Sequence, residues 1–146
     1  MSDNANQVVS LHKEGGLNCA QAMLSVYGAG FGLDKETAIK LASCFGAGMG
    51  RMGETCGAVT GAFMVLGLTY EPEDPKARGK VYDLVRKFRD KFVARNGSIR
   101  CKDLLGYDMD TEQGMRVIKE KKLTAAICPK MDRDAAEILE EILSEI

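Results

Sequence analysis

The five cysteines are the residues of this chain that are best suited to chemistry. Three of them, Cys19, Cys56 and Cys101, fall in the first turn of a predicted helix, where free N–H groups and the helix dipole stabilise a thiolate. Cys128 directly precedes a proline, which favours an extended backbone at residue 128. Cys44 falls near a predicted helix end, where the dipole disfavours a thiolate. The pattern therefore predicts a working set of four cysteines that excludes Cys44.

The spacing of these four cysteines leaves three roles open. No Cys-x-x-Cys pair is present, so neither a thioredoxin-type pair nor a zinc ribbon is indicated. In thiol–disulfide cycling, the reaction of an oxidoreductase, Cys56 would be the attacking thiolate and Cys101 or Cys19 would resolve the mixed disulfide. Four converging thiolates, from Cys19, Cys56, Cys101 and Cys128, would instead hold zinc or an iron–sulfur cluster. Free cysteines also often simply pack in a core.

The stretch from Cys56 to Tyr70 contains no charged residue, although 28% of the chain is charged. The run is shorter than the ~20 apolar residues of a membrane span, so it predicts a buried central helix at about residues 55–69. Gly57 and Gly61 lie four residues apart and reduce one face of this helix to backbone. We expect another helix, such as the one that begins at Asn18, to pack there and bring a second thiol close. The two glycines are also our candidates for contact with a cofactor.

Helical periodicity elsewhere predicts an all-α single domain over residues 1–146, with about six to eight helices around the central one. A literal Gly-x-Gly-x-x-Gly runs from Gly48 to Gly53, but the dinucleotide fingerprint requires a preceding strand, and no strand is predicted. The loop can still present N–H groups to an anion or a thiolate. Asp132 is predicted to cap the last helix. The single histidine, His12, is expected at the edge of the first helix's apolar stripe.

Charge is unevenly distributed in this chain of net charge −1. Residues 76–102 hold ten Lys and Arg against two acids, a net +8, so the remainder carries −9. We interpret this segment as the solvated face of a long helix. It lacks the aromatic interleaving that is typical of nucleic-acid binding, although it could be the contact surface of a non-enzymatic partner-binding domain. The start of the chain lacks a signal-peptide pattern, which predicts a cytoplasmic protein without a membrane span, compatible with a homo-oligomer.

The run Cys56-Gly-Ala-Val-Thr-Gly61 resembles the Cys-Gly-Ala-x-x-Gly motif of the C_GCAxxG_C_C family, small bacterial and archaeal proteins described as "putative redox-active". Members carry four characteristic cysteines. Cys56 falls in the motif, and the other three family cysteines resemble Cys19, Cys101 and Cys128. The resemblance implies redox chemistry with an unknown redox partner, but that description itself derives from the cysteines.

Overall fold

The computed structural model describes residues 2–146, which form helices joined by turns. The only strand-like pairing among them is an isolated bridge between Thr55 and Arg100. The all-α fold predicted from the sequence is confirmed. The helices, in chain order, are α1 (Asp3–Lys13), α2 (Cys19–Gly28), η1 (Ala29–Phe31), α3 (Lys35–Ala42), η2 (Ser43–Phe45), α4 (Gly46–Met49), α5 (Gly57–Gly67), α6 (Ala77–Asn96), α7 (Cys101–Leu105), α8 (Glu112–Glu120) and α9 (Leu123–Ser144).

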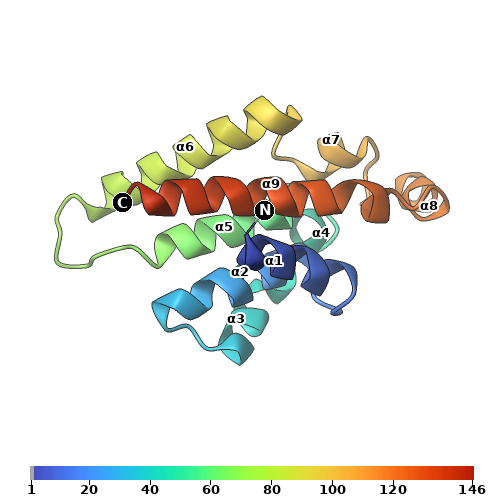
Figure 1. Ribbon diagram of the computed structural model, residues 1–146. Coiled ribbons are helices and arrows are strands. Elements are labelled where there is room, and N and C mark those ends of the chain that lie inside the picture. The colour runs from blue at the N-terminus through green and yellow to red at the C-terminus, as the bar shows by residue number, and fades with distance from the viewer. Residues whose placement is uncertain (1) are drawn as a thin grey trace.

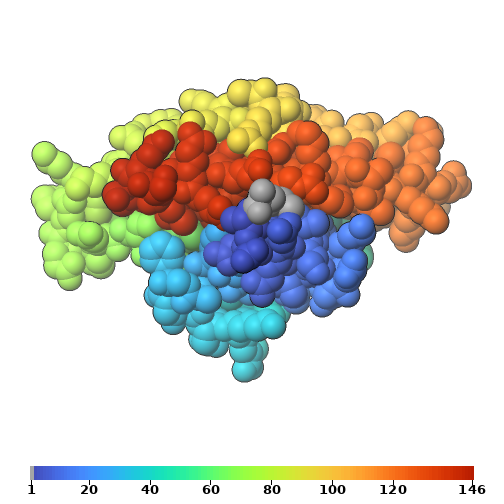
Figure 2. Space-filling model, viewed as in Figure 1, coloured from blue at the N-terminus to red at the C-terminus, as the bar shows by residue number. Residues whose placement is uncertain are grey.

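Helix α9 crosses the whole molecule, with α6 and α7 on one side and α1, α2 and α3 on the other (Figure 1). In the space-filling view it forms a continuous red-to-orange band between the blue of α1 and the yellow of α6 (Figure 2). The charge-free run forms α5, which is buried along most of its length and contacts α2, α6 and α9. The prediction of a buried central helix is therefore confirmed.

Helix α2 packs directly on the glycine face of α5. A Cβ atom on Gly57 would lie 2.2 Å from Sγ of Cys19, and one on Gly61 would lie 2.7 Å from Cβ of Met23. Neither position has room for a side chain, so both glycines are needed for the close approach of the two helices. The expectation that they bring a second thiol close to Cys56 is confirmed. Their contact with a cofactor stays a prediction, because α2 covers the face that they expose.

The sequence-based boundary of the last helix is wrong. Helix α9 begins at Leu123 rather than at Asp132 and continues through Pro129, so Cys128 is helical and not extended. A proline inside a helix leaves the carbonyl of the residue four positions earlier without its N–H partner. That residue, Ala125, is exposed, so water can bind its carbonyl. Asp132 is consequently not a cap but a buried residue on the inner face of α9.

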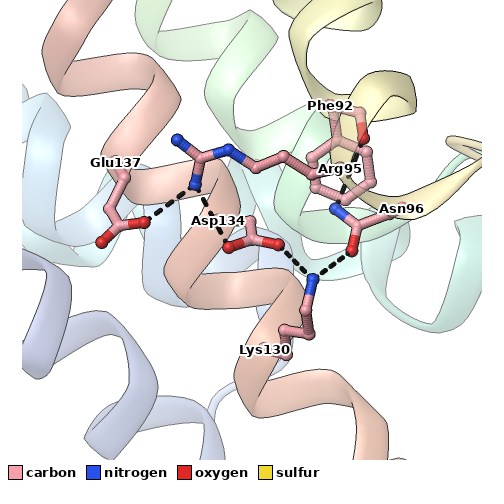
Figure 3. Close-up of polar contacts among 6 residues, drawn as sticks. All are labelled: Phe92, Arg95, Asn96, Lys130, Asp134 and Glu137. Carbon is pink, nitrogen blue, oxygen red and sulfur yellow. Dashed lines mark hydrogen bonds and ion pairs between the residues drawn. The ribbon is translucent and has the colours of Figure 1, made fainter.

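Three cations of the basic segment pair with acidic residues of α9 or with the acidic residue that follows it. On α6, Lys87 pairs with Glu145, and Lys91 pairs with Glu141. Arg95 bridges Glu137 at 2.8 Å and Asp134 at 3.2 Å, and Asp134 also accepts from Lys130 (Figure 3). These ion pairs join α6 to α9, and the side chains of Lys87 and Arg95 are still 43% and 39% exposed. Among the described residues, no helix is long and apolar enough to cross a membrane.

Candidate thiol site

Four cysteines occupy defined positions at the ends or on the inner faces of four helices. Cys19 is the first residue of α2, after a capping box formed by Asn18 and Gln21. Cys56 is the N-cap of α5, Cys101 is the first residue of α7, and Cys128 lies in α9.

Two backbone hydrogen bonds hold the segments of Cys56 and Cys101 together. The N–H of Cys56 donates to the carbonyl of Ile99 at 2.7 Å, and the N–H of Cys101 donates to the carbonyl of Glu54 at 2.6 Å. These two hydrogen bonds fix the backbone positions of Cys56 and Cys101 relative to each other, although the two cysteines are far apart in the chain.

The charges of these four sulfurs act on one another. Ionised Cys19 raises the pKa of Cys56 and of Cys128, and ionised Cys101 raises the pKa of Cys19 and of Cys128. Coulomb interactions weaken with distance, so Cys19 lies within electrostatic reach of Cys56 and Cys128, and Cys101 lies within reach of Cys19 and Cys128. We call Cys19, Cys56, Cys101 and Cys128 the thiol group. All five cysteines are free, and Cys44, which lies outside this group in η2, is exposed.

The expectation that helix starts make these thiols acidic is wrong in its net direction. Burial, and then the charge of Asp132, raises the pKa of Cys19 to about 11, although N–H groups of Ala47 and Ala20 hydrogen bond to its sulfur and lower it. Burial likewise raises the pKa of Cys101 to about 11, with a further contribution from Asp108. The pKa of Cys56 is raised well above its ordinary value by burial and then by Cys19. Desolvation therefore outweighs the helix-start effect.

The glycine-rich loop reaches the thiol group through its backbone. Residues 47–51 all have positive φ, which gives a left-handed turn that contains Ala47, Met49 and Arg51 as well as two glycines. The left-handed conformation costs roughly 1–2 kcal/mol for each non-glycine residue. The N–H of Ala47 hydrogen bonds to the sulfur of Cys19 from this turn. The loop thus presents an N–H group to a sulfur, as its composition suggested, without any dinucleotide fold.

Asp132 is the charged residue of the site that sequence reasoning missed. Its Oδ2 accepts from Nδ1 of His12 at 2.5 Å, whereas its buried Oδ1 has no hydrogen-bond partner among the described residues. Burial raises the pKa of Asp132, which His12 only partly offsets. Burial alone would lower the pKa of His12, but the hydrogen bond and charge of Asp132 outweigh it and raise that pKa. The charge of Asp132 also raises the pKa of Cys19, Cys56 and Cys128.

A signal for Asp132 was present in the sequence. Asp132 follows Cys128 by four residues and precedes the buried Ala135 by three, which is the spacing of one helix face. Pro129 indicates a helix break before Asp132, so the sequence pattern predicts a helix cap at Asp132 instead. His12 lies at the predicted edge of α1, and its partner could not be read from sequence because it lies 120 positions away.

A small pocket gives access to one edge of the thiol group. Its volume is about 160 Å³, and its lining includes His12, Lys13, Cys128 and Asp132. Cys128 is half-buried, whereas the other three members of the thiol group are buried. Cys128 is therefore the member that a molecule in this pocket meets.

Fold and site together define an all-α protein with three buried free thiols and a fourth that is half-buried. The chain belongs to the family described as "Putative redox-active protein (C_GCAxxG_C_C)", which matches residues 17–142. Comparison with curated proteins and with solved structures found no match.

Proposed function

We propose that this protein is a thiol–disulfide redox protein in which Cys128 exchanges with external disulfides and Cys19 completes an internal disulfide. The observation that carries the proposal is the electrostatic coupling of four thiols, of which Cys128 alone is half-buried beside a pocket. The description of the family, "Putative redox-active protein", names the same chemistry. Cys56 was our sequence-based candidate for the attacking thiolate, but its burial argues for a later role.

The exchange proceeds in two steps. Cys128 loses its proton and attacks one sulfur of a disulfide RSSR, which forms a Cys128–SR mixed disulfide and releases RS⁻, which takes up that proton. Cys19 then attacks Sγ of Cys128, forms the Cys19–Cys128 disulfide and releases a second RSH. Two protein thiols are oxidised, and one external disulfide is reduced to two thiols.

Asp132 and His12 serve this exchange as proton acceptors. The thiols have raised pKa values, so each must transfer its proton to a base before it attacks. Asp132 lies one helical turn after Cys128 and has a buried oxygen without a hydrogen-bond partner among residues 2–146. His12 contacts the same carboxylate, and its side chain is 22% exposed, which links Asp132 to solvent.

Trapping of the mixed disulfide tests these roles. The Cys44→Ser protein serves as the background, and it is treated with oxidised 2-mercaptoethanol and mapped by mass spectrometry. We expect a disulfide between Cys19 and Cys128 in this background and a stable mixed disulfide on Cys128 when Cys19 is also changed to Ser. Failure of any intramolecular disulfide to form under mild oxidants would contradict the proposal. A mixed disulfide trapped on Cys56 would overturn the order of the steps.

A second candidate function is binding of zinc or an iron–sulfur cluster by the thiol group. Its support is the mutual repulsion of the thiolates, which a bound cation would relieve. This reading predicts stoichiometric metal, and colour in the case of iron, in protein prepared without oxygen. Metal analysis and absorption spectroscopy of the wild-type and Cys56→Ser proteins test it. Colourless, metal-free wild-type protein would contradict it.

A further inference from the structure

A groove much larger than the pocket at Cys128 lies between the left-handed turn, helix α8 and the start of α9. Its volume is about 630 Å³, within the range of roughly 300–1,000 Å³ that is typical of small-molecule sites. The residues that characterise it are Arg51, Met109, Met115, Ile118, Lys119 and Lys122. We call this feature the cationic groove.

The charge of the cationic groove has one sign. Arg51, Lys119 and Lys122 line it, and no acidic side chain does. Within residues 2–146, none of these three cations forms an ion pair, in contrast to Lys87, Lys91 and Arg95 on α6. Three unpaired cations around one concave surface attract an anion and raise its local concentration.

Two of these cations occupy strained backbone positions. Arg51 has φ 70° and Lys122 has φ 51°, and the only other non-glycine residues with positive φ in the described chain are Ala47 and Met49. Strained conformations of this kind persist where the surroundings enforce them, and they cluster at binding sites. Helix α9 also begins at this groove without any side-chain cap, so its first turn adds a positive dipole end.

The floor of the cationic groove borders the thiol group. Ile118 is buried in one apolar cluster with Cys101, and Met109 and Cys128 pack against that cluster. Thr124 and Ala125 line both the groove and the small pocket that contains Cys128. The groove and the pocket that Cys128 lines are therefore neighbours that share Thr124 and Ala125.

We propose that the cationic groove binds the substrate and that this substrate is a small anionic disulfide with an apolar part, such as an aromatic or aliphatic disulfide that carries carboxylates. The cations bind the carboxylates, and Met109, Met115 and Ile118 contact the apolar part. The proposal rests on the proposed disulfide exchange and adds the charge class of its substrate.

Two aromatic disulfides that differ in charge, one dianionic and one neutral, test the proposal. Stopped-flow kinetics compare the dianionic 5,5′-dithiobis(2-nitrobenzoate) with the neutral 4,4′-dithiodipyridine. The groove variant carries Arg51→Gln, Lys119→Gln and Lys122→Gln. The control variant removes three cations elsewhere, through Lys35→Gln, Lys76→Gln and Arg78→Gln, so both variants have the same net charge.

We expect the ratio of the anionic to the neutral rate constant to fall about tenfold or more in the groove variant and to change little in the control. A ratio that falls equally in both variants would show that only net charge matters, and it would overturn the proposal.

Binding without exchange separates the groove from the redox chemistry. The probe is 3,3′-thiodipropionate, a dicarboxylate that has no disulfide bond, and chemical-shift changes in NMR spectra of the Cys19→Ser/Cys128→Ser protein report its binding. We expect shifts at the groove that disappear in the groove variant. If the double variant binds the probe but the wild-type protein fails to exchange disulfides, the groove stands and the proposed function is refuted. If the probe causes the same chemical-shift changes in the groove variant while the wild-type protein exchanges disulfides, the groove alone is refuted.

Discussion

Two carboxylates on helix α9 lie two residues apart and have opposite surroundings. Asp134 accepts from Lys130 and Arg95 on the α6 side, and Figure 3 shows that Arg95 also donates to Glu137 and Lys130 to Asn96. Asp132 faces the thiol group on the other side and has His12 as its only hydrogen-bond partner among the described residues. The neighbouring cations lower the pKa of Asp134 against the opposing effect of burial, whereas burial raises that of Asp132.

The different surroundings of Asp134 and Asp132 distinguish two faces of α9, a structural face against α6 and a reactive face against the thiol group. Between α6 and α9, charged side chains are paired, which is how proteins usually bury or half-bury charge. Around the thiol group, a buried carboxylate oxygen lacks a partner in the part of the chain that the structure describes, thiol pKa values are raised, and the backbone of residues 47–51 is strained. Such local violations are expected at functional sites.

The largest predicted effect concerns the helix contact that places the first two thiols. Gly61→Leu would place its Cβ 2.7 Å from Met23 and 3.1 Å from the carbonyl of Ala20, so we expect a loss of more than about 3 kcal/mol in the free energy of unfolding. Gly67→Leu in the same helix is the matched control, because a Cβ there meets no atom within 4 Å. Urea unfolding measures both. Equal stability of the two variants would disprove the packing role of Gly61.

The next effect distinguishes the partners of the two carboxylates. His12→Ala leaves the buried Asp132 without its hydrogen-bond donor, and we expect it to cost about 3 kcal/mol near neutral pH. Lys130→Ala leaves Asp134 its contact with Arg95 and should cost about 1 kcal/mol or less. Thermal unfolding monitored by circular dichroism compares them. If His12→Ala and Lys130→Ala lose the same stability, Asp132 does not depend on its partner more than Asp134 does.

The smallest effect is a difference in pH dependence. Because the pKa of Asp134 is lowered by folding, its stabilisation is present above the ordinary value of 3.8 and is lost as pH falls through its folded pKa. Because the pKa of Asp132 is raised, its protonated form favours folding below 3.8, and that contribution is lost as pH rises through its folded pKa.

Asp134→Asn and Asp132→Asn test these two trends. From pH 3 to 6, wild-type protein should gain stability relative to Asp134→Asn and lose stability relative to Asp132→Asn. Urea unfolding over this pH range measures both differences. Slopes of the same sign would contradict the contrast.

Much of the site was predictable because helix signals are local. The charge-free run predicted the buried α5, and the spacing of Gly57 and Gly61 predicted the close approach of α2. The positions of Cys19 and Cys101 at helix starts were also correct. The start of α9 was missed because Pro129 normally ends a helix, and here the exposed carbonyl of Ala125 makes the proline tolerable.

The sequence by itself determined the all-α fold and the central helix, and it predicted that four of the cysteines form one set. These follow from periodicity, charge and helix-start chemistry, which act between residues close in the chain. The tertiary structure alone decided that burial overrides the helix dipole at the thiols, that Asp132 meets His12, and that three cations without an ion pair among residues 2–146 line one groove. Desolvation and ion pairing depend on neighbours distant in the chain, so no local pattern encodes them.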